Sequence, residues 1–479
     1  MTTSSVRAQA SDVVGISRRR GASLIMSGHS RNTKIAAYII CFLVVYVLGT
    51  TIYQSHFAGM FVPDVEVDES GRTRVRRRPQ LHRKKLDPSQ VTTEVDAILE
   101  GYLTMIDLNV PPTAVQGHTA YQGVTAKFCH IDWKLQQKAP HKVPMFNDLI
   151  RQSKMCDSTM VTVDLWDLAT QAKAYDAKLK SEISVVPPTG VIFHESRCGS
   201  TLVANLLAGF APEKTRVYSE NSVQLNAIMA CDGNPCNPDL HAKLIQDVFY
   251  LSGRSVHTET FDYVFYKISS LGSLFIDSFA AAMPQVPWMY LYRDTVEVMQ
   301  SHLNPHKGGG FLSRERPVCL RLQTAANANH QPSTTLQIAN SKQRDPMTMS
   351  KEEYCATHLA ALSLSAIQEY QRTHRGRFVN YKMLPNFVWE TLLPRDYGIP
   401  VDATMIERMQ ALSHTYSKAR NKADPSFSED ATSKRQQASP EVRMAADLLA
   451  QDVYAQLETL SQQQLEQQQQ QQAPEGHQR

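Results

Sequence analysis

Several features are scarce in this chain of 479 residues, and each absence narrows its function. Lys and Arg number 50 against 46 Asp and Glu, a formal net charge of only +4. Nucleic-acid binding depends on many cations that neutralise phosphates, so no nucleic-acid partner is expected. The cysteines and histidines have no zinc-site spacing, and no metal is expected. No Asn-x-Ser/Thr acceptor occurs, so N-glycosylation is not expected either.

Eight cysteines are present, one in a long apolar run (Cys41) and one in a turn described below (Cys198). Six cysteines remain, and six allow fifteen pairings. Proximity along the chain favours Cys231 with Cys236, Cys129 with Cys156, and Cys319 with Cys355. Disulfides form in oxidising compartments, so these cysteines modestly support a secretory-pathway location.

The apolar run extends from Ile35 to Tyr53, nineteen residues without a charge. At 1.5 Å per residue such a helix crosses a bilayer, so the run predicts a transmembrane signal anchor. Six Lys and Arg residues precede it against one acid, and no basic residue follows until Arg72. The positive-inside rule then makes residues 1–34 a cytosolic tail and the remainder luminal. The basic cluster from Arg72 to Lys85 would oppose this orientation if it lay nearer to the apolar run.

The luminal part divides by composition. Residues 54–90 are polar and predict a stem, in which Arg74-Val75-Arg76-Arg77 fits a convertase site that would shed a soluble form; a solvated basic stem is the alternative. Residues 91–183 are expected to be helical, as in Val91 to Leu99 and Leu165 to Ala169. The glutamine-rich residues 461–479 are expected to be disordered or a frayed helix.

The most informative segment begins at Gly190, where an apolar strand runs into a small-residue turn that opens a helix at Ser200. The first N–H groups of a helix have no internal partner and carry partial positive charge, so they can bind a phosphate. Arg197 adds a charge, and Ser200 and Thr201 add hydroxyl donors. An ordinary helix cap with a close-packed glycine is the alternative interpretation.

The same turn lacks a lysine. The Walker pattern requires Gly-Lys-[Ser/Thr] to hold a magnesium triphosphate, whereas Gly199 directly precedes Ser200 here. A nucleotide held through one terminal phosphate is therefore favoured over a kinase-like triphosphate.

A second strand and helix follow from Val286 to His302. Arg293 ends the apolar strand, and Ser301 lies eight positions later on the helix. This spacing can place a guanidinium and a hydroxyl on the same side, where both could hold one phosphate. The alternative is that Arg293 only forms an ion pair with Asp294 or Glu297.

Together the two motifs resemble those of the sulfotransferase superfamily, which transfers sulfonate from 3′-phosphoadenylyl sulfate (PAPS). In order, Arg197, Cys198, Gly199, Ser200 and Thr201 match the family's 5′-phosphosulfate motif, and Arg293 with Ser301 matches its 3′-phosphate motif. The resemblance covers residues 184–460. It implies an α/β three-layer sandwich with a mostly parallel sheet, similar to P-loop nucleotide-binding proteins.

The chain departs from this pattern immediately before the turn. Ser196 stands where family members often have proline, and Glu195 places an acid beside a phosphate site. If the Glu195 side chain points away from the nucleotide, it has a structural role. If it faces the nucleotide, the resemblance is weakened.

The resemblance also suggests catalytic residues. Membrane-bound carbohydrate sulfotransferases often use a glutamate about two dozen residues after the first motif, and Glu220 lies 23 residues after Arg197. Glu220 is the expected general base, with a solvated carboxylate as the alternative. His257 is the reserve candidate, as in cytosolic members. The basic segment Tyr416 to Lys422 lies where the family has a loop that closes over the nucleotide.

Lys267 ends the alternating run from Phe261 to Tyr266, which predicts a strand. A lysine at the carboxyl end of such a strand can enter the ligand crevice and offset the sulfonate's developing charge. A surface lysine is the other interpretation.

The anchor and stem resemble the layout of Golgi glycan-modifying enzymes. Together the two resemblances imply a single-pass type II Golgi membrane protein that transfers sulfonate from PAPS, without a metal, to a glycan or protein tyrosine. The alternatives are a P-loop kinase and an inactive membrane-tethered nucleotide-binding protein. The sequence specifies no oligomeric state.

Overall fold

The computed structural model describes residues 65–67, 73–75, 94–178, 183–256, 261–303, 317–328, 330–423, 426–427 and 430–470. The predicted membrane anchor, most of the stem and the reserve base at position 257 lie outside these ranges. Within them, no helix is long and apolar enough to cross a membrane. The chain divides into Met1–Val65 and Glu66–Arg479, and the second unit is described below.

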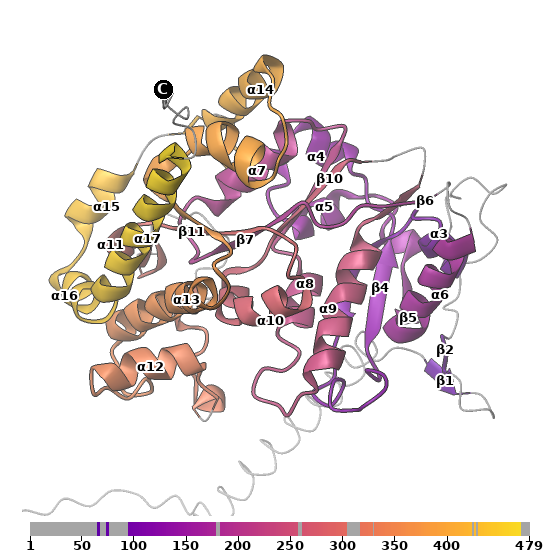
Figure 1. Cartoon of the computed structure of the whole chain (residues 1–479), viewed down its shortest axis with the longest axis horizontal. Coiled ribbons are helices and arrows are strands. Elements are labelled where there is room, and N and C mark those ends of the chain that lie inside the picture. The colour runs from indigo at the N-terminus through magenta and orange to yellow at the C-terminus, as the bar shows by residue number, and fades with distance from the viewer. Residues whose placement is uncertain are drawn as a thin grey trace, which may run out of the picture. The chain divides into compact units, whose positions relative to one another are not determined.

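A five-stranded parallel sheet forms the centre of this unit, in the order β12-β11-β7-β10-β8 (Figure 1). Its strands are β7 (Gly190–His194), β8 (Thr215–Ser219), β10 (Tyr263–Lys267), β11 (Trp288–Tyr292) and β12 (Arg377–Asn380). Lys267 is in register with Ser219, and His194 with Leu291. The carboxyl ends of these strands, with the residues that follow them, therefore meet at one edge of the sheet.

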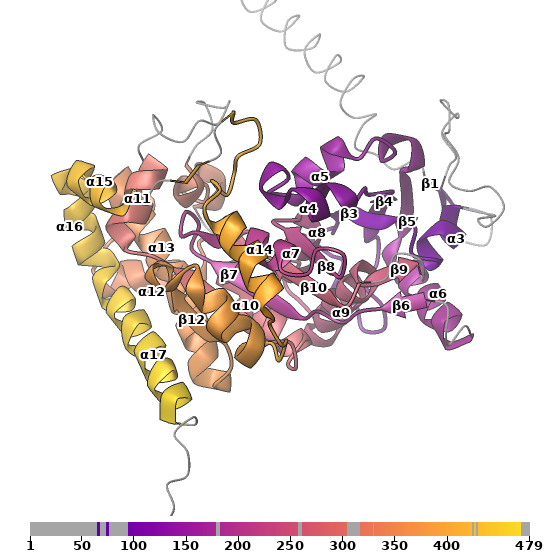
Figure 2. The same ribbon diagram turned by 90° about the horizontal axis from the view of Figure 1, so that it is seen from above.

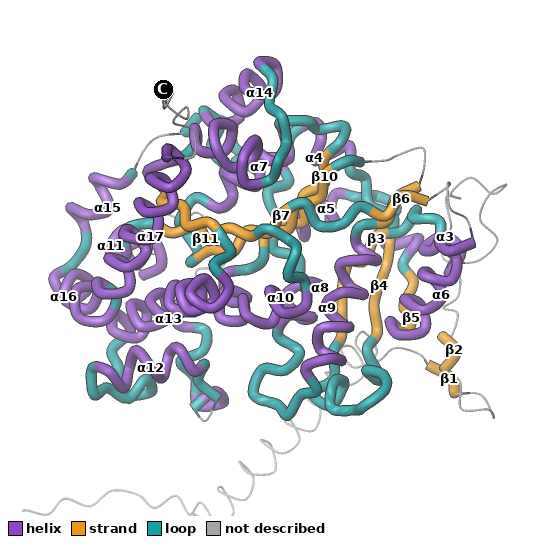
Figure 3. Tube along the Cα trace, in the orientation of Figure 1, coloured by secondary structure: helices purple, strands orange, loops and turns teal. Residues whose placement is uncertain are grey.

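Alternate residues of each strand enter different hydrophobic clusters. Val191 and Phe193 of β7 belong to one cluster, and Ile192 between them belongs to the other. Figure 3 shows the strands as an orange band between helices on both sides. Because side chains alternate across a strand, the sheet is buried on both faces, and the predicted α/β three-layer arrangement is confirmed.

Helices α7 (Ser200–Gly209) and α14 (Ala403–Ser413) pack on one face of the sheet, with α10 (Ile276–Ala282) and α13 (Lys351–Thr373) on the other (Figure 1). The remaining α-helices are α3 (Glu94–Leu99), α4 (Lys134–Lys138), α5 (Phe146–Gln152), α6 (Leu165–Lys178), α8 (Ser222–Ile228), α9 (Pro238–Ser252), α11 (Thr295–Leu303), α12 (Ser333–Ser341), α15 (Ala431–Gln437), α16 (Pro440–Leu449) and α17 (Gln451–Gln470).

Short 3₁₀ turns connect these elements: η2 (Pro140–Lys142), η3 (Asp157–Thr159), η5 (Ser270–Phe275), η7 (Val318–Leu320), η8 (Ala325–Asn327) and η9 (Tyr381–Met383). Residues Val388–Asp396 form a π-helix, η10. The described residues contain seven further short strands. β1 (Val65–Val67) and β2 (Thr73–Val75) lie in the predicted stem, β6 (Ile183–Val185) pairs with β9 (Arg254–Val256), and the other three form the sheet described next.

The expectation that residues 91–183 are helical is wrong in part. α3 and α6 lie where predicted, but β3 (Thr104–Asn109), β4 (Thr125–Cys129) and β5 (Val161–Asp164) form an antiparallel sheet. The burial of β5 alternates residue by residue, which is the period of a half-buried strand. In Figure 2 this sheet lies beside α8. Gln136 joins this region to β8, because its amide bonds both the N–H and the C=O of Val217, at 3.0 and 2.8 Å.

All three disulfides expected from proximity are present. Cys129 is bonded to Cys156, Cys231 to Cys236, and Cys319 to Cys355. Cys198 is a free, buried thiol.

The expectation for the glutamine-rich end also needs correction, since residues 461–470 continue α17 and pack on β12. The Gln464 side chain accepts the Phe378 N–H at 2.9 Å and donates to the Gly376 C=O at 2.9 Å. Ser461 donates to the Phe378 C=O at 3.1 Å. A glutamine carries both a donor and an acceptor, so it can satisfy the unpaired edge of β12 as a neighbouring strand would.

We therefore expect Gln464→Ala to lower the free energy of unfolding by about 1–3 kcal/mol, because it leaves buried backbone groups unpaired. Gln463→Ala is the matched control, since Gln463 is exposed on the same helix. Chemical denaturation of both variants measures the difference. Equal stability of the two would show that α17 does not secure the sheet edge.

Candidate active site

The turn that was predicted to bind phosphate, named the cradle here, connects β7 to α7 and has strained backbone geometry. Ser196, Arg197 and Gly199 all have positive φ, at 74°, 54° and 91°. Such conformations cost about 1–3 kcal/mol each for residues other than glycine and gather at ligand sites. A Cβ on Gly199 would lie 2.6 Å from the Tyr381 ring, so glycine is required here for space as well as for φ. The backbone of this turn is therefore held in an unusual conformation directly before the first residue of α7.

Glu195 points away from this cradle. Its carboxylate is buried and accepts the backbone N–H of Arg293 at 2.5 Å, while its own N–H donates to the Leu291 C=O at 3.3 Å. Burial raises the pKa of Glu195 well above its usual value. The acid that departs from the family pattern is therefore a structural link between the ends of β7 and β11.

The other residues of the turn differ in exposure. Cys198 is fully buried, its thiol lies 3.2 Å from the Leu291 C=O, and burial raises its pKa strongly, so it is not a thiolate nucleophile. Ser200 and Thr201 are buried at the start of α7, where their backbone N–H groups have no partner earlier in the helix. Arg197 is exposed.

Glu220 and Lys267 form an ion pair at the same edge of the sheet. The lysine side chain is fully buried at the end of β10, and the Glu220 side chain is 31% exposed. Glu220 follows β8 with a φ of 53°, and its N–H donates to the Lys267 C=O at 2.7 Å. The structure therefore brings together the two residues predicted as catalytic, and the surface alternative for Lys267 is wrong.

The charges around Glu220 determine its protonation. Burial raises its pKa, but the ammonium groups of Lys267 and Lys418 outweigh burial and lower the pKa to about 2. Glu220 is therefore ionised at neutral pH, and while it is paired with Lys267 it is a weak proton acceptor.

His194, the last residue of β7, lies beside this pair. Its Nδ1 accepts the Ser196 N–H at 2.9 Å, and its Nε2 lies 3.8 Å from Glu220 Oε1. Burial and the charge of Lys267 lower the pKa of His194 to about 3, so the imidazole is neutral. No motif in the sequence singled out His194 as a site residue.

Lys418 lies in the predicted basic loop, but the sequence did not single it out as a site residue. Burial and the charges of Lys267 and Arg197 lower its pKa to about 8, against the effect of Glu220. The loop is tied to α7, since the Asn205 amide donates to the Ser417 C=O at 3.0 Å. Arg420 reaches Asp148 at 2.8 Å. The loop thus adds a cation to the group around Glu220.

The second motif is arranged differently from the expectation. The guanidinium of Arg293 is buried, pairs with Glu297 and Asp430, and lies 4.3 Å from the centre of the Tyr381 ring. Tyr381 also faces Gly199, so one ring separates the two predicted phosphate motifs.

Ser301 lies one helical turn beyond Glu297, and its hydroxyl donates to the Glu297 C=O at 2.9 Å. The alternative prediction for Arg293 was an ion pair with Asp294 or Glu297, and the pair with Glu297 is present. Arg435 of α15 also reaches Glu297, at 2.7 Å. An anion that binds Arg293 must therefore compete with the carboxylates of Glu297 and Asp430.

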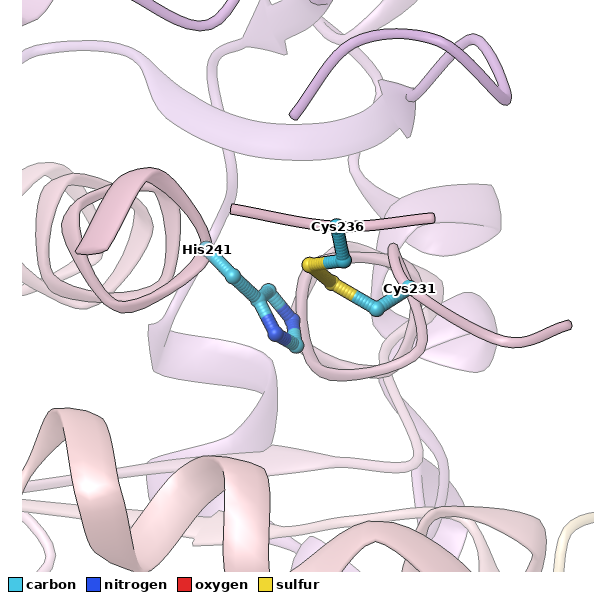
Figure 4. A group of neighbouring side chains, drawn as sticks. All are labelled: Cys231, Cys236 and His241. Atoms are coloured by element: carbon cyan, nitrogen blue, oxygen red, sulfur yellow. A yellow bond between two sulfur atoms is a disulfide. The ribbon is translucent and has the colours of Figure 1, made fainter. Parts of the chain in front are cut away.

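Cys231, Cys236 and His241 form a separate cluster of side chains of the types that bind metals. The ligand atoms of Cys231, Cys236 and His241 lie within 4.8 Å of one another (Figure 4). The two sulfurs are joined in a disulfide, and His241 Nε2 lies 2.9 Å from the Ala227 C=O. A disulfide offers no thiolate, so these residues do not fit a metal site in this state.

Comparisons with known proteins add little to this geometry. No family model and no curated protein matches the chain. Among solved structures, a sulfotransferase domain from the curacin biosynthetic pathway is similar over 55% of this chain and 98% of its own, with 11% identity and a TM-score of 0.28. At this level of similarity the match assigns no function to the chain.

The depressed pKa of Glu220 predicts a pH-dependent stability. Its folded pKa of about 2 lies below its unfolded value, so the stabilisation is complete above roughly pH 4.5 and is lost as pH falls toward 2. At about 1.4 kcal/mol per pKa unit, it amounts to about 3 kcal/mol.

The free energy of unfolding, measured from pH 6 to 3, should therefore fall more steeply for wild type than for Glu220→Gln. Glu213→Gln, at an exposed position, serves as the control and should follow wild type. Parallel curves for all three proteins would contradict the ion pair.

Proposed function

We propose that this protein is a sulfotransferase that moves a sulfonate group from PAPS to a hydroxyl or amine of its acceptor. The observation that carries the proposal is the Lys267–Glu220 pair, which lies at the same sheet edge as the strained turn before α7. A buried cation beside a carboxylate offers what such a transfer needs, a group that offsets developing negative charge and a group that takes a proton.

Two sets of residues would hold the donor. The backbone of the turn, with Arg197, Ser200 and Thr201, suits the 5′-phosphosulfate, because the first N–H groups of a helix have no acceptor earlier in the helix and Arg197 precedes them in the turn. Arg293 and Ser301 are assigned to the 3′-phosphate. The donor supplies an activated sulfonate, and no metal is invoked because arginine, lysine and helix dipole offset its charge.

Glu220 and Lys267 then divide the chemistry. As the acceptor oxygen or nitrogen bonds to sulfur and the bond from sulfur to the phosphate-side oxygen breaks, Glu220 takes the acceptor's proton. A carboxylate with a pKa of about 2 does this poorly while Lys267 holds it. The ion pair between Lys267 and Glu220 must therefore weaken before transfer. A donor anion bound in the cradle would weaken it, because the anion competes with Glu220 for the Lys267 ammonium.

The location is proposed on separate grounds. The apolar run of residues 35–53 and the charges around it favour a type II anchor in the Golgi membrane with the catalytic unit in the lumen. Three disulfides support an oxidising compartment. Such a location suits a glycan or a protein tyrosine as acceptor.

The direct test is transfer of label from ³⁵S-PAPS to glycans, tyrosine peptides and small alcohols. Glu220→Gln keeps the shape of the side chain but cannot take a proton at neutral pH, so we expect kcat to fall by about 10²–10⁴ while adenosine 3′,5′-bisphosphate still binds. Glu213→Gln should retain full activity.

Other outcomes separate the alternatives. Normal turnover by Glu220→Gln would remove this residue as the base. Binding of the bisphosphate without transfer to any acceptor would indicate the inactive nucleotide-binding protein, and preference for a magnesium triphosphate would indicate the kinase.

A further inference from the structure

A cavity of about 250 Å³ lies where three segments distant in sequence meet. Its apolar wall includes Leu271, Leu274 and Phe275 of η5. Its polar rim has Asp232 and Asn234 on one side and Asn327 and His330 on the other. The proposed chemistry uses none of these residues.

One side of the rim lies inside a short disulfide loop, and the other side follows a disulfide-bonded cysteine in the sequence. Asp232 and Asn234 lie inside the loop closed by the Cys231–Cys236 disulfide. The opposite side follows Cys319, which is bonded to Cys355 of α13. The two sides meet, since a Cβ on Gly233 would lie 3.5 Å from His330 Nδ1.

The segment that carries Asn327 and His330 is also held internally. The buried amide of Gln331 donates to the C=O groups of Leu322 and Asn327, both at 2.9 Å. Its carbonyl oxygen accepts the Tyr354 hydroxyl at 2.6 Å. The rim is therefore pre-organised, which reduces the entropy lost when a ligand binds.

The cavity is connected to the proposed catalytic pair through two short elements. α8 begins just after Glu220 and ends before Met229, which lines the cavity, and its seven residues span about 10 Å. η5 begins three residues after Lys267, and its Ser273 hydroxyl bonds the N–H and C=O of His194, each at 3.1 Å. A group in the cavity would thus lie about one short helix away from the transfer site.

The chemistry of the lining favours a neutral, hydroxyl-rich ligand. A carboxylate, two amides and an imidazole together donate and accept hydrogen bonds, as a sugar hydroxyl also does. None of the described residues that line the cavity is a lysine or arginine, the usual partners of sulfate, phosphate and carboxylate groups. Phe275 and the leucines offer an apolar surface for the C–H face of a ring.

We infer that this cavity binds a neutral pyranose unit of the acceptor, one or more units away from the hydroxyl that receives the sulfonate. The inference rests on the proposed function. The inference favours a glycan with an uncharged stretch as the acceptor. A tyrosine peptide with acidic residues is disfavoured, because the Asp232 carboxylate would repel it.

The test is binding of the full chain in detergent to an array of neutral glycans, uronate-containing or sulfated glycans, and tyrosine peptides. Adenosine 3′,5′-bisphosphate is present throughout. We expect neutral glycans to bind, and Asn327→Ala and His330→Ala each to weaken binding about 3- to 10-fold through lost hydrogen bonds. Asn340→Ala, an exposed asparagine outside the cavity, should bind like wild type.

Binding restricted to charged glycans or peptides would overturn the inference, as would neutral-glycan binding that neither cavity variant weakens. Absence of any neutral-glycan binding while the bisphosphate still binds would also overturn it, and would leave the proposed sulfotransferase intact. Failure to bind the bisphosphate would instead count against the proposed function.

Discussion

A fully buried lysine in this fold lies against a carboxylate that compensates it. Lys267 ends the strand next to β8, and Glu220 is the residue with which the chain leaves β8. Removing a charge from water costs several kcal/mol unless a partner compensates it, so the two residues constrain each other. Burial and the charge of Lys267 together lower the pKa of both the His194 imidazole and the Lys418 ammonium, which lie close to this pair.

The same principle applies at the second motif, where Arg293 is compensated by Glu297 and Asp430. The two cations best placed to bind an anion are therefore already paired with carboxylates. A donor has to replace these partners rather than fill an uncompensated site, so part of its binding energy is offset by the ion pairs it breaks. Glu195 couples the two motifs, because it fixes the backbone of Arg293 from the turn that begins the cradle.

Much of this arrangement could be predicted from local sequence. The strand, turn and helix from Gly190 onward show their own period and turn residues, and the three disulfides join cysteines close along the chain. Lys267 was expected at a strand end and Glu220 was expected from its spacing after Arg197, and the parallel strands β8 and β10 bring the two together.

Other features depend on contacts that no local pattern encodes. Asp430 reaches Arg293 from 137 residues away, and the direction of the Glu195 side chain depends on β11 lying beside β7. Gln464 is buried because its amide completes the edge of β12, although its neighbours in sequence suggest a solvated tail. The strands of residues 104–164 were missed because short strands between helices give a weak periodic signal.

The central claim is that an anionic nucleotide binds between the two motifs and replaces Glu297 and Asp430 as the partner of the Arg293 guanidinium. Calorimetric titration with adenosine 3′,5′-bisphosphate tests it most directly, with Arg293→Ala and Asp430→Asn measured beside wild type. Arg293→Ala should weaken binding by about 1.5–3 kcal/mol, because charged hydrogen bonds are lost. Asp430→Asn should strengthen it, because it removes a competing carboxylate. Equal affinities for all three proteins, or no binding to any of them, would contradict the account.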